Sequence, residues 1–449
     1  MPNAGYKVSQ LAQRTYRTAV KRLSVLRAPR SKMRATIINK YGLYDATSLS
    51  LTPLRWSATA AQVIFGSPLN PLHYTLAGRM IAASADVFTS ITKRRGKPEW
   101  DIDAKMDVID ERPFCRLVRF SRDRGYEVPQ ILMVAALSGH YATLMRGTIE
   151  ALIAEHDVYV TDWADAKMVP LDRGPFDLDE YISYTIDYIR MLGPNIHVMA
   201  VCQPAPAVLA AVALMAAHHD PAQPRTMTIM AGPVDVRVNP NRAAKIAESL
   251  SLGFFERNVI TRVPAYYPGA GRRVYPGLVQ LGAFISMNAK RHVNAHIAMY
   301  NELVRGDGEA AAVREKFYDE YLSVMDVTAE YFLTTAEQVF MKHALPRGTL
   351  TWRGERVDLS AVRSTALMTV EGELDDLCSP GMTVAAQDLC SSLTAGQREH
   401  LLQPGVGHYG VFNGRRFREE IMPRISRFMR KHERGGHAMS AMSSYRSFA

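Results

Sequence analysis

Three residues suited to nucleophilic catalysis occur along the chain in the order cysteine, aspartate, histidine. Cys202, Asp375 and His408 each follow an apolar segment that is typical of a buried β-strand. A histidine oriented by a carboxylate can take the proton of a thiol, and the thiolate can then attack a carbonyl carbon. These residue types in this order predict acyl transfer through a covalent thioester.

The surroundings of Cys202 support its role as the nucleophile. It lies between a predicted strand (195–201) and a predicted helix, with Ala200 two positions before it and Pro204 two positions after it. Proline is tolerated in the first helical turn, and a helix N-terminus lowers the pKa of a thiol. A single cysteine is more often a small buried apolar residue. However, the chain contains no G-x-S-x-G motif, so no serine competes at a comparable turn.

The acid and the histidine are each assigned from a short motif. In "VEGELDDLCSP" the Gly-x-x-Asp spacing favours Asp375 over Asp376, although either carboxylate could orient an imidazole. The alternative is a loop carboxylate that caps the next helix. In "GVGHYGVF" the neighbouring glycines let a loop carry His408 back over the edge of the sheet. A hydrogen-bonded loop histidine without a catalytic role is the alternative here.

Two backbone segments are expected to bind the oxyanion. The N–H of Gln203, directly after the cysteine, is one predicted donor. A second should come from the turn after the strand predicted at 130–137, where Leu137 and Ser138 are the candidates. Ser138 is also an alternative nucleophile, but it lacks the strand–turn–helix context of Cys202.

No cofactor or metal site is predicted. His292 and His296 are four residues apart and could both contact a metal, but no third ligand or acidic helper lies nearby. A pair on a helix surface is the better interpretation. No nucleotide-binding motif is present, so coenzyme A enters only as a conceivable acyl acceptor.

The elements that must position these residues follow an alternating pattern from about residue 100. Apolar strand segments alternate with helical ones, and Asp177 is placed to cap the helix that carries Ile182, Ile186 and Ile189 on one face. Strands that are apolar on both faces favour a parallel sheet covered by helices. Together with the order of the three catalytic candidates, this predicts an α/β-hydrolase fold with a mostly parallel sheet.

The alternation stops after Pro233 and resumes near Ser364. The intervening segment is rich in aromatic residues and mostly helical in pattern, which indicates an inserted lid, since an unstructured loop of this length is improbable. The predicted division is a basic tail (1–40), an N-terminal helical region (41–100), two core segments (101–234 and 346–432) that flank a helical lid (235–345), and a polar C-terminal tail (433–449).

Charge is concentrated at one end of the chain. The first 40 residues hold ten Lys and Arg and no acid; the remaining 44 Lys and Arg are matched by 44 Asp and Glu. A neutral body argues against nucleic-acid binding. Apolar runs are too short to cross a membrane, no secretory signal is evident, and four unpaired cysteines favour reduced thiols in a cytoplasm.

The basic tail itself has three interpretations. It is a disordered tail or an over-long start, with Met33 as an alternative initiator; or a helix that binds an anionic surface; or a mitochondrial-type presequence.

Longer motifs carry a family resemblance. "VCQP", "LSGHYATLMRGT", "RTMTIMAGPVD", "YPGAGRRVYPGLVQLGAF", "STALMTVEGELDD" and "GHYGVFNGRRFREEI" resemble the intracellular polyhydroxybutyrate (PHB) depolymerases over about residues 41–432. The resemblance implies a Cys-Asp-His triad at Cys202, Asp375 and His408. Related polyester synthases have an elbow that is similar to G-x-C-x-G-G, which this chain lacks, and the family pattern does not account for residues 1–40.

The resemblance also implies a substrate and a cellular location. We expect ester bonds of poly(3-hydroxybutyrate) to be cleaved to 3-hydroxybutyrate monomers or oligomers, with water or coenzyme A as the acyl acceptor. The expected location is cytoplasmic, on storage granules and near their coat proteins; the oligomeric state stays open. Two alternatives are a synthase-type acyltransferase and an inactive granule protein.

Overall fold

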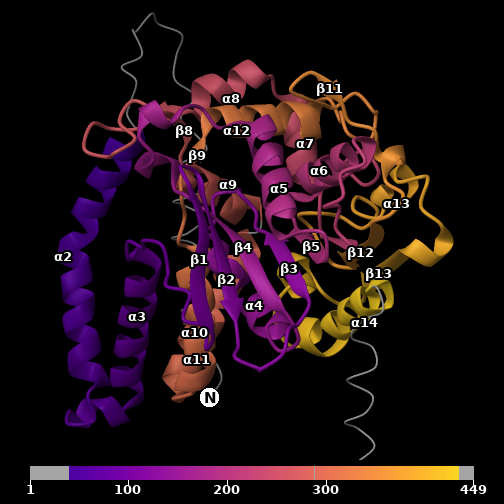
Figure 1. Cartoon of the computed structure of the whole chain (residues 1–449). Coiled ribbons are helices and arrows are strands. Elements are labelled where there is room, and N and C mark those ends of the chain that lie inside the picture. Colours follow the sequence, from indigo (N-terminus) through magenta and orange to yellow (C-terminus); the bar gives the residue numbers. More distant parts are fainter. Residues whose placement is uncertain (1–39, 288, 434–449) are drawn as a thin grey trace, which may run out of the picture. The chain divides into compact units, whose positions relative to one another are not determined.

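The computed structural model describes residues 40–287 and 289–433 (Figure 1). The predicted basic tail lies outside this range except for Lys40, and the predicted C-terminal tail lies outside it except for Glu433. The interpretations of both tails therefore stay predictions.

An eight-stranded sheet forms the centre of the described chain. Its order is β1-β2-β4-β3-β5-β6-β12-β13. β2 pairs antiparallel with both of its neighbours, and all other pairs are parallel. The strands are β1 Lys105–Arg112, β2 Cys115–Ser121, β3 Gln130–Val134, β4 Asp157–Trp163, β5 Ile196–Val201, β6 Thr226–Met230, β12 Ala366–Gly372 and β13 Arg398–Gln403.

Burial explains which strands the sequence pattern predicts. Every residue of β4, β5, β6 and β12 is buried, so these segments are apolar on both faces, and the prediction of a mostly parallel sheet is confirmed. β1 and β2 were not expected. β1 is a largely exposed edge strand of sequence "KMDVIDER", and its charged residues hide the strand pattern. β3 ends at Val134, earlier than predicted, and the Ala135 N–H donates to the Thr161 hydroxyl instead.

Helices cover both faces of the sheet (Figure 1). α5 (Leu178–Leu192) and α6 (Ala205–Ala217) pack together on one face, and α4 (Arg146–Leu152) and α14 (Met422–His432) lie on the other. Asp177 caps α5 as predicted, because its carboxylate accepts from the Glu180 N–H at 3.0 Å.

The segment between β6 and β12 contains the predicted lid (residues 235–345). It is mainly helical, as expected, but it also holds a three-stranded sheet that was not predicted because its strands have only two or three residues. The helices are α7 Arg242–Ser249, α8 Leu252–Asn258, α9 Gly277–Met287, α10 Ala289–Arg305, α11 Gly308–Tyr321, α12 Ala329–Thr335 and the π-helical turn η5 Ala336–Met341; the strands are β7 Thr261–Arg262, β8 Arg273–Tyr275 and β9 Val327–Thr328.

Two antiparallel helices precede the sheet: α2 (Lys40–Gly66) and α3 (Leu76–Thr92) (Figure 1). Here they are called the N-terminal hairpin. α3 packs against α10 of the lid, and just after α3 the guanidinium of Arg95 pairs with Asp319 of α11 at 2.7 Å. Of the helices in the described part of the chain, none combines the length and the apolar character needed to cross a bilayer.

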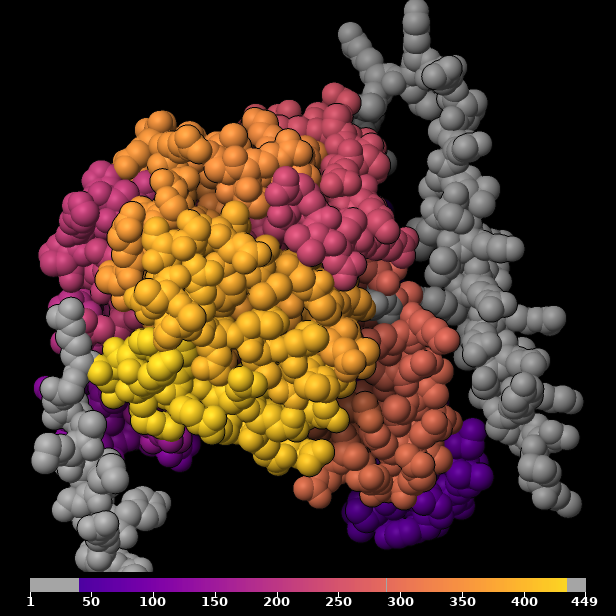
Figure 2. Space-filling model, turned by 90° about the vertical axis from the view of Figure 1, so that its right-hand side faces the viewer, coloured from indigo at the N-terminus to yellow at the C-terminus, as the bar shows by residue number. Residues whose placement is uncertain are grey.

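Short elements complete the chain. They are η1 Pro71–Tyr74, η2 Ala142–Met145, η3 Ala166–Met168, η4 Leu171–Arg173, β10 Thr351–Trp352, β11 Glu355–Arg356, η6 Leu359–Ala361, α13 Ala385–Leu389, η7 Ala395–Gln397, η8 His408–Val411 and η9 Phe417–Ile421. The lid helices α10 and α11, salmon in Figure 2, lie beside the yellow-orange C-terminal part of the core. Contacts of Phe317 and Tyr321 with Tyr409 join the two.

Candidate active site

The chain turns sharply at Cys202, between the end of β5 and the start of α6. Cys202 has a φ of +69°, which is rare for a residue with a side chain, and its N–H donates to the Met230 carbonyl at 2.8 Å. Gly232 lies beneath the turn, where an added Cβ would come within 2.2 Å of the Ala205 Cβ. Close packing therefore holds a strained conformation that places the Cys202 side chain at the carboxyl end of the sheet.

Asp375 and His408 meet at the same edge. The His408 Nδ1 lies 2.8 Å from the Asp375 Oδ2, and the other carboxylate oxygen accepts from the N–H groups of Leu377 and Cys378 at 2.9 and 2.8 Å. Both side chains are buried, whereas Asp376 is exposed. The structure thus places Asp375, rather than its neighbour, against the imidazole.

The ring of His408 also interacts electrostatically with Cys202, and both side chains line the same cavity. Burial disfavours a charged ring, but the Cys202 thiolate and the Asp375 carboxylate outweigh it and raise the pKa of His408 well above its ordinary value. These opposite shifts favour a thiolate at Cys202 beside a protonated His408.

A second cysteine, which sequence reasoning missed, contacts the nucleophile. The buried side chain of Cys378 interacts with that of Cys202, and the interaction favours the proton on Cys378. This interaction, together with the nearby imidazolium of His408, holds the pKa of Cys202 well below its ordinary value despite burial. The same contact, with burial, raises the pKa of Cys378. The proton is therefore favoured on Cys378 and the negative charge on Cys202. The motif "DDLCSP" contains Cys378, but only the fold shows what it touches.

A buried carboxylate shapes the loop that carries the acid. Glu371, near the end of β12, accepts backbone N–H bonds from Gly381, Thr383 and Val384 at 2.7–3.0 Å. Its oxygens are committed to the loop, so Glu371 supports the position of Asp375 and does not compete with it for His408.

Of the three predicted oxyanion donors, one is already hydrogen-bonded to another of the described residues and two are not. The Leu137 N–H donates to the side-chain Oε1 of Gln203 at 3.0 Å, so it is not free to bind an oxyanion in this conformation and is a correction to the prediction. The backbone N–H groups of Ser138 and Gln203 have no acceptor among residues 40–287 and 289–433. These two remain the candidate donors.

Gln203 links the oxyanion region to the lid. While its Oε1 accepts from Leu137, its Nε2 donates to the hydroxyl of Tyr331 in α12. The adjoining loop is tied to the lid as well, because the Met325 N–H donates to the Gly139 carbonyl at 2.8 Å and the buried His140 ring lies 3.1 Å from the Tyr321 carbonyl. The lid thus fixes the turn that follows β3.

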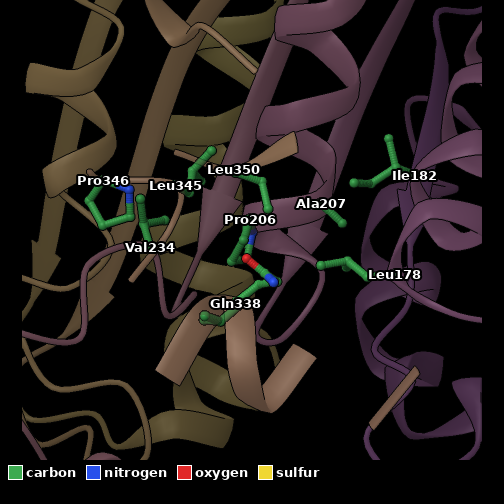
Figure 3. A pocket seen from close by; sticks show the side chains of 10 residues that line it. Leu178, Ile182, Pro206, Ala207, Val234, Gln338, Leu345, Pro346 and Leu350 are labelled. Atoms are coloured by element: carbon green, nitrogen blue, oxygen red, sulfur yellow. The ribbon is translucent and has the colours of Figure 1, made fainter. Parts of the chain in front are cut away.

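A cavity of about 50 Å³ lies over the sulfur. Ser138 lines this cavity, and its side chain makes no hydrogen bond to His408 in the part of the chain that the structure describes. Among its other lining residues are Cys202, His140, Met145, Phe284, Leu377, His408, Tyr409 and Phe412. A separate void of about 10 Å³ between α5, α6 and the segment 345–350 is walled mostly by apolar side chains around Gln338 (Figure 3). That void has room for about one water molecule and is a packing feature.

The Nδ1 atoms of His292 and His296 both lie against protein oxygens. The Nδ1 of His292 lies 3.1 Å from the Tyr318 hydroxyl, and the Nδ1 of His296 lies 2.8 Å from the His292 carbonyl. Across residues 40–287 and 289–433, no three His, Cys, Asp or Glu side chains are grouped as metal ligands would be.

The fold and the site together define an α/β-hydrolase. The sheet has the strand order of that fold with one antiparallel strand, β2; the chain turns at Cys202 after β5, and an acid and a histidine follow the last two strands. Residues 231–433 match the family described as PHB de-polymerase C-terminus, a segment that includes the lid, Asp375 and His408 but not Cys202. The chain is thus an α/β-hydrolase whose residues 231–433 are similar to the PHB depolymerase family.

Solved structures with a related fold are distant in sequence. A thermophilic esterase from Thermogutta terrifontis is 13% identical, with 71% of this chain and 95% of that chain covered and a TM-score of 0.39. A soluble variant of monoglyceride lipase from Saccharomyces cerevisiae is 10% identical, with 76% and 100% covered and a TM-score of 0.44. Among curated proteins, no sequence matches. Identities this low carry no information about substrate.

Proposed function

We propose that this hydrolase cleaves the ester bonds of poly(3-hydroxybutyrate) through Cys202, His408 and Asp375. One observation carries the proposal: a strained cysteine lines a cavity together with a histidine that is hydrogen-bonded to a buried aspartate, in a protein whose residues 231–433 match the PHB depolymerase family.

The first half-reaction forms a thioester. The Cys202 thiolate attacks the ester carbonyl carbon, and the backbone N–H groups of Ser138 and Gln203 bind the oxyanion. When the tetrahedral intermediate collapses, the ester C–O bond breaks and the leaving alkoxide takes the proton of the His408 imidazolium. Asp375 holds the ring so that its Nε2 side faces the reacting atoms.

The second half-reaction restores the enzyme. His408, now neutral, takes a proton from water as the water oxygen attacks the thioester carbonyl, and the C–S bond breaks to release a 3-hydroxybutyrate product and the thiolate. Coenzyme A is the alternative acceptor; its thiol would give a coenzyme A thioester by the same exchange. No bound cofactor is required in either route.

Because the proposed substrate is a polyester stored in granules, we expect the enzyme to bind granules in the cytoplasm. The N-terminal hairpin, from Lys40 to Thr92, carries five charged side chains, and many of its large apolar side chains are exposed. Those exposed by half or more include Leu43, Leu49, Leu54, Trp56, Val63, Ile64, Leu69, Leu72, Tyr74, Leu76 and Ile91. Exposed apolar area on this scale suits an apolar polyester surface, although coat proteins are another possible partner.

The decisive experiment measures 3-hydroxybutyrate and oligomers released from amorphous granules, with and without coenzyme A. Cys202→Ala should lower release by several orders of magnitude, because the covalent step disappears. Asp375→Asn should also be severely impaired, and the matched variant Asp376→Asn should retain release.

Each outcome has a clear meaning. Undiminished release by Cys202→Ala would refute the proposed nucleophile, and equal loss in the two aspartate variants would refute Asp375 as the orienting acid. A coenzyme A thioester formed only when coenzyme A is present would identify thiolysis. Net polymer growth from 3-hydroxybutyryl-coenzyme A would instead support the synthase alternative.

A further inference from the structure

A larger cavity adjoins the one over the sulfur. Its volume is about 360 Å³, within the range of small-molecule binding sites, and the two cavities share Phe284, Leu377 and Tyr409. Its walls come from the lid helices α9, α10 and α11 on one side and from the segments around Asp376 and Tyr409 on the other. A chain bound at Cys202 can therefore extend past these three side chains into the second cavity.

One cation in this cavity is not paired with a carboxylate of the residues that the structure describes. Arg291 of α10 is exposed and makes no hydrogen bond or ion pair with any described residue. The other guanidinium of the wall, that of Arg314, is engaged by Glu302 at 2.8 Å. His292 does not add a charge near neutral pH, because burial, His296 and Arg291 lower its pKa. Asp376 is the carboxylate of the wall, and it too has no hydrogen bond or ion pair among the described residues.

Arg291 is placed on the side of the leaving group. Its Nη1 lies 3.5 Å from the position that a Cβ on Gly407 would occupy, and Gly407 directly precedes His408. Because His408 gives its proton to the leaving alkoxide, the fragment that departs as an alcohol must lie on the histidine side of the sulfur. In a 3-hydroxybutyrate polyester, that fragment ends in a free carboxylate.

We propose that Arg291 binds the terminal carboxylate of the leaving fragment, so that the enzyme preferentially cleaves short chains and chain ends from their carboxylate end. The inference rests on the proposed function. The apolar walls hold the methyl-bearing backbone, and the guanidinium pairs with the carboxylate through charge-assisted hydrogen bonds. Asp376 opposes this anion and limits its affinity.

The test compares soluble 3-hydroxybutyrate oligomers that end in a free carboxylate with the same oligomers capped as methyl esters. For the wild-type protein, kcat/KM should be about tenfold higher for the free acids, mainly through KM, as expected for one charge-assisted bond at a solvent-accessible site. Arg291→Gln should bring the ratio of the two substrates close to one, Arg291→Lys should keep part of the preference, and Asp376→Asn should increase it.

Lys290→Gln is the matched control, because Lys290 is an exposed neighbouring cation that does not line the cavity. It should leave the ratio unchanged. Equal kcat/KM for free and capped oligomers in the wild-type protein, or an unchanged ratio in Arg291→Gln, would overturn the inference. Failure of the proposed function would look different: neither oligomer would be cleaved in a Cys202-dependent way.

Discussion

Cys378 is the residue that most changes the chemistry expected of Cys202. Its side chain interacts with Cys202, the proposed nucleophile, and lowers the pKa of that residue, while its N–H donates to the Asp375 carboxylate that contacts His408. A hydrogen bond to an anion is worth about 1.5–3 kcal/mol, or about one to two pH units in the pKa of the acceptor. Cys378 therefore acts as a positioning residue for two members of the triad.

This contact predicts a specific pH profile. Activity should fall at low pH, as Cys202 is protonated below its lowered pKa, and at high pH, as His408 loses its proton above its raised pKa. Cys378→Ala should move the acid limb of kcat/KM upward by about one to two pH units, and Cys378→Ser, which keeps a donor, should move it less. Ultraviolet absorbance of the thiolate gives an independent reading, and superimposable profiles for all three proteins would contradict the assignment.

The position of Cys202, Asp375 and His408 at one edge of the sheet was predictable, because each follows a strand and the strand ends of a parallel sheet converge there. The role of Gln203 was only half predictable. Its backbone position follows from the turn, but its side-chain bonds reach Leu137 and Tyr331, which are remote in sequence. Nothing in local patterning encodes such contacts, so the expectation that Leu137 donates to an oxyanion was wrong for this conformation.

At the scale of elements, the turn between β5 and α6 depends on the strand beside it. Gly232 follows β6, and a Cβ there would lie 2.2 Å from the Ala205 Cβ and 3.1 Å from the Cys202 carbonyl oxygen. We expect Gly232→Ala to cost about 1–3 kcal/mol of folding stability and to lower kcat at least tenfold, because the turn must shift.

A matched substitution separates this effect from the loss of a glycine in general. Gly396 has open space around its Cβ position, so Gly396→Ala should leave both properties near wild type. Denaturant unfolding and kcat on a soluble ester measure the two effects. A stable, fully active Gly232→Ala protein would show that the packing beneath the turn is not needed.

The fully buried strands were predictable from the sequence, and the exposed edge strand β1 was not. The segments β4, β5, β6 and β12 stand out as mostly apolar runs, whereas β1 carries five charged residues and has no fully buried one. The short strands β7, β8 and β9 pair across the lid and have too few residues to form a pattern.

At the scale of the whole molecule, the N-terminal hairpin is the surface that we propose for docking on polyester. Trp56 and Leu69 are 73% and 94% exposed. If the hairpin docks on polyester, the double variant Trp56→Ser/Leu69→Ser should weaken granule binding roughly tenfold or more, since burial of each such side chain is worth about 1.5–3 kcal/mol. Hydrolysis of soluble oligomers should not change.

Met191→Ser provides the control, because Met191 is 46% exposed on α5 of the core. Co-sedimentation with granules and kcat/KM on oligomers measure the two activities separately. Equal granule binding by all three proteins would exclude the hairpin as the docking surface.

The order of the strands also has a consequence for how the protein is made. Cys202 leaves the ribosome well before Cys378 and His408, and β12 must pair with β6 after the whole lid has been synthesised. Until then, the sulfur has neither the Cys378 thiol nor the imidazolium that keeps it ionised. The nascent chain therefore carries an ordinary cysteine, and nucleophilic reactivity emerges only with the last strands of the sheet.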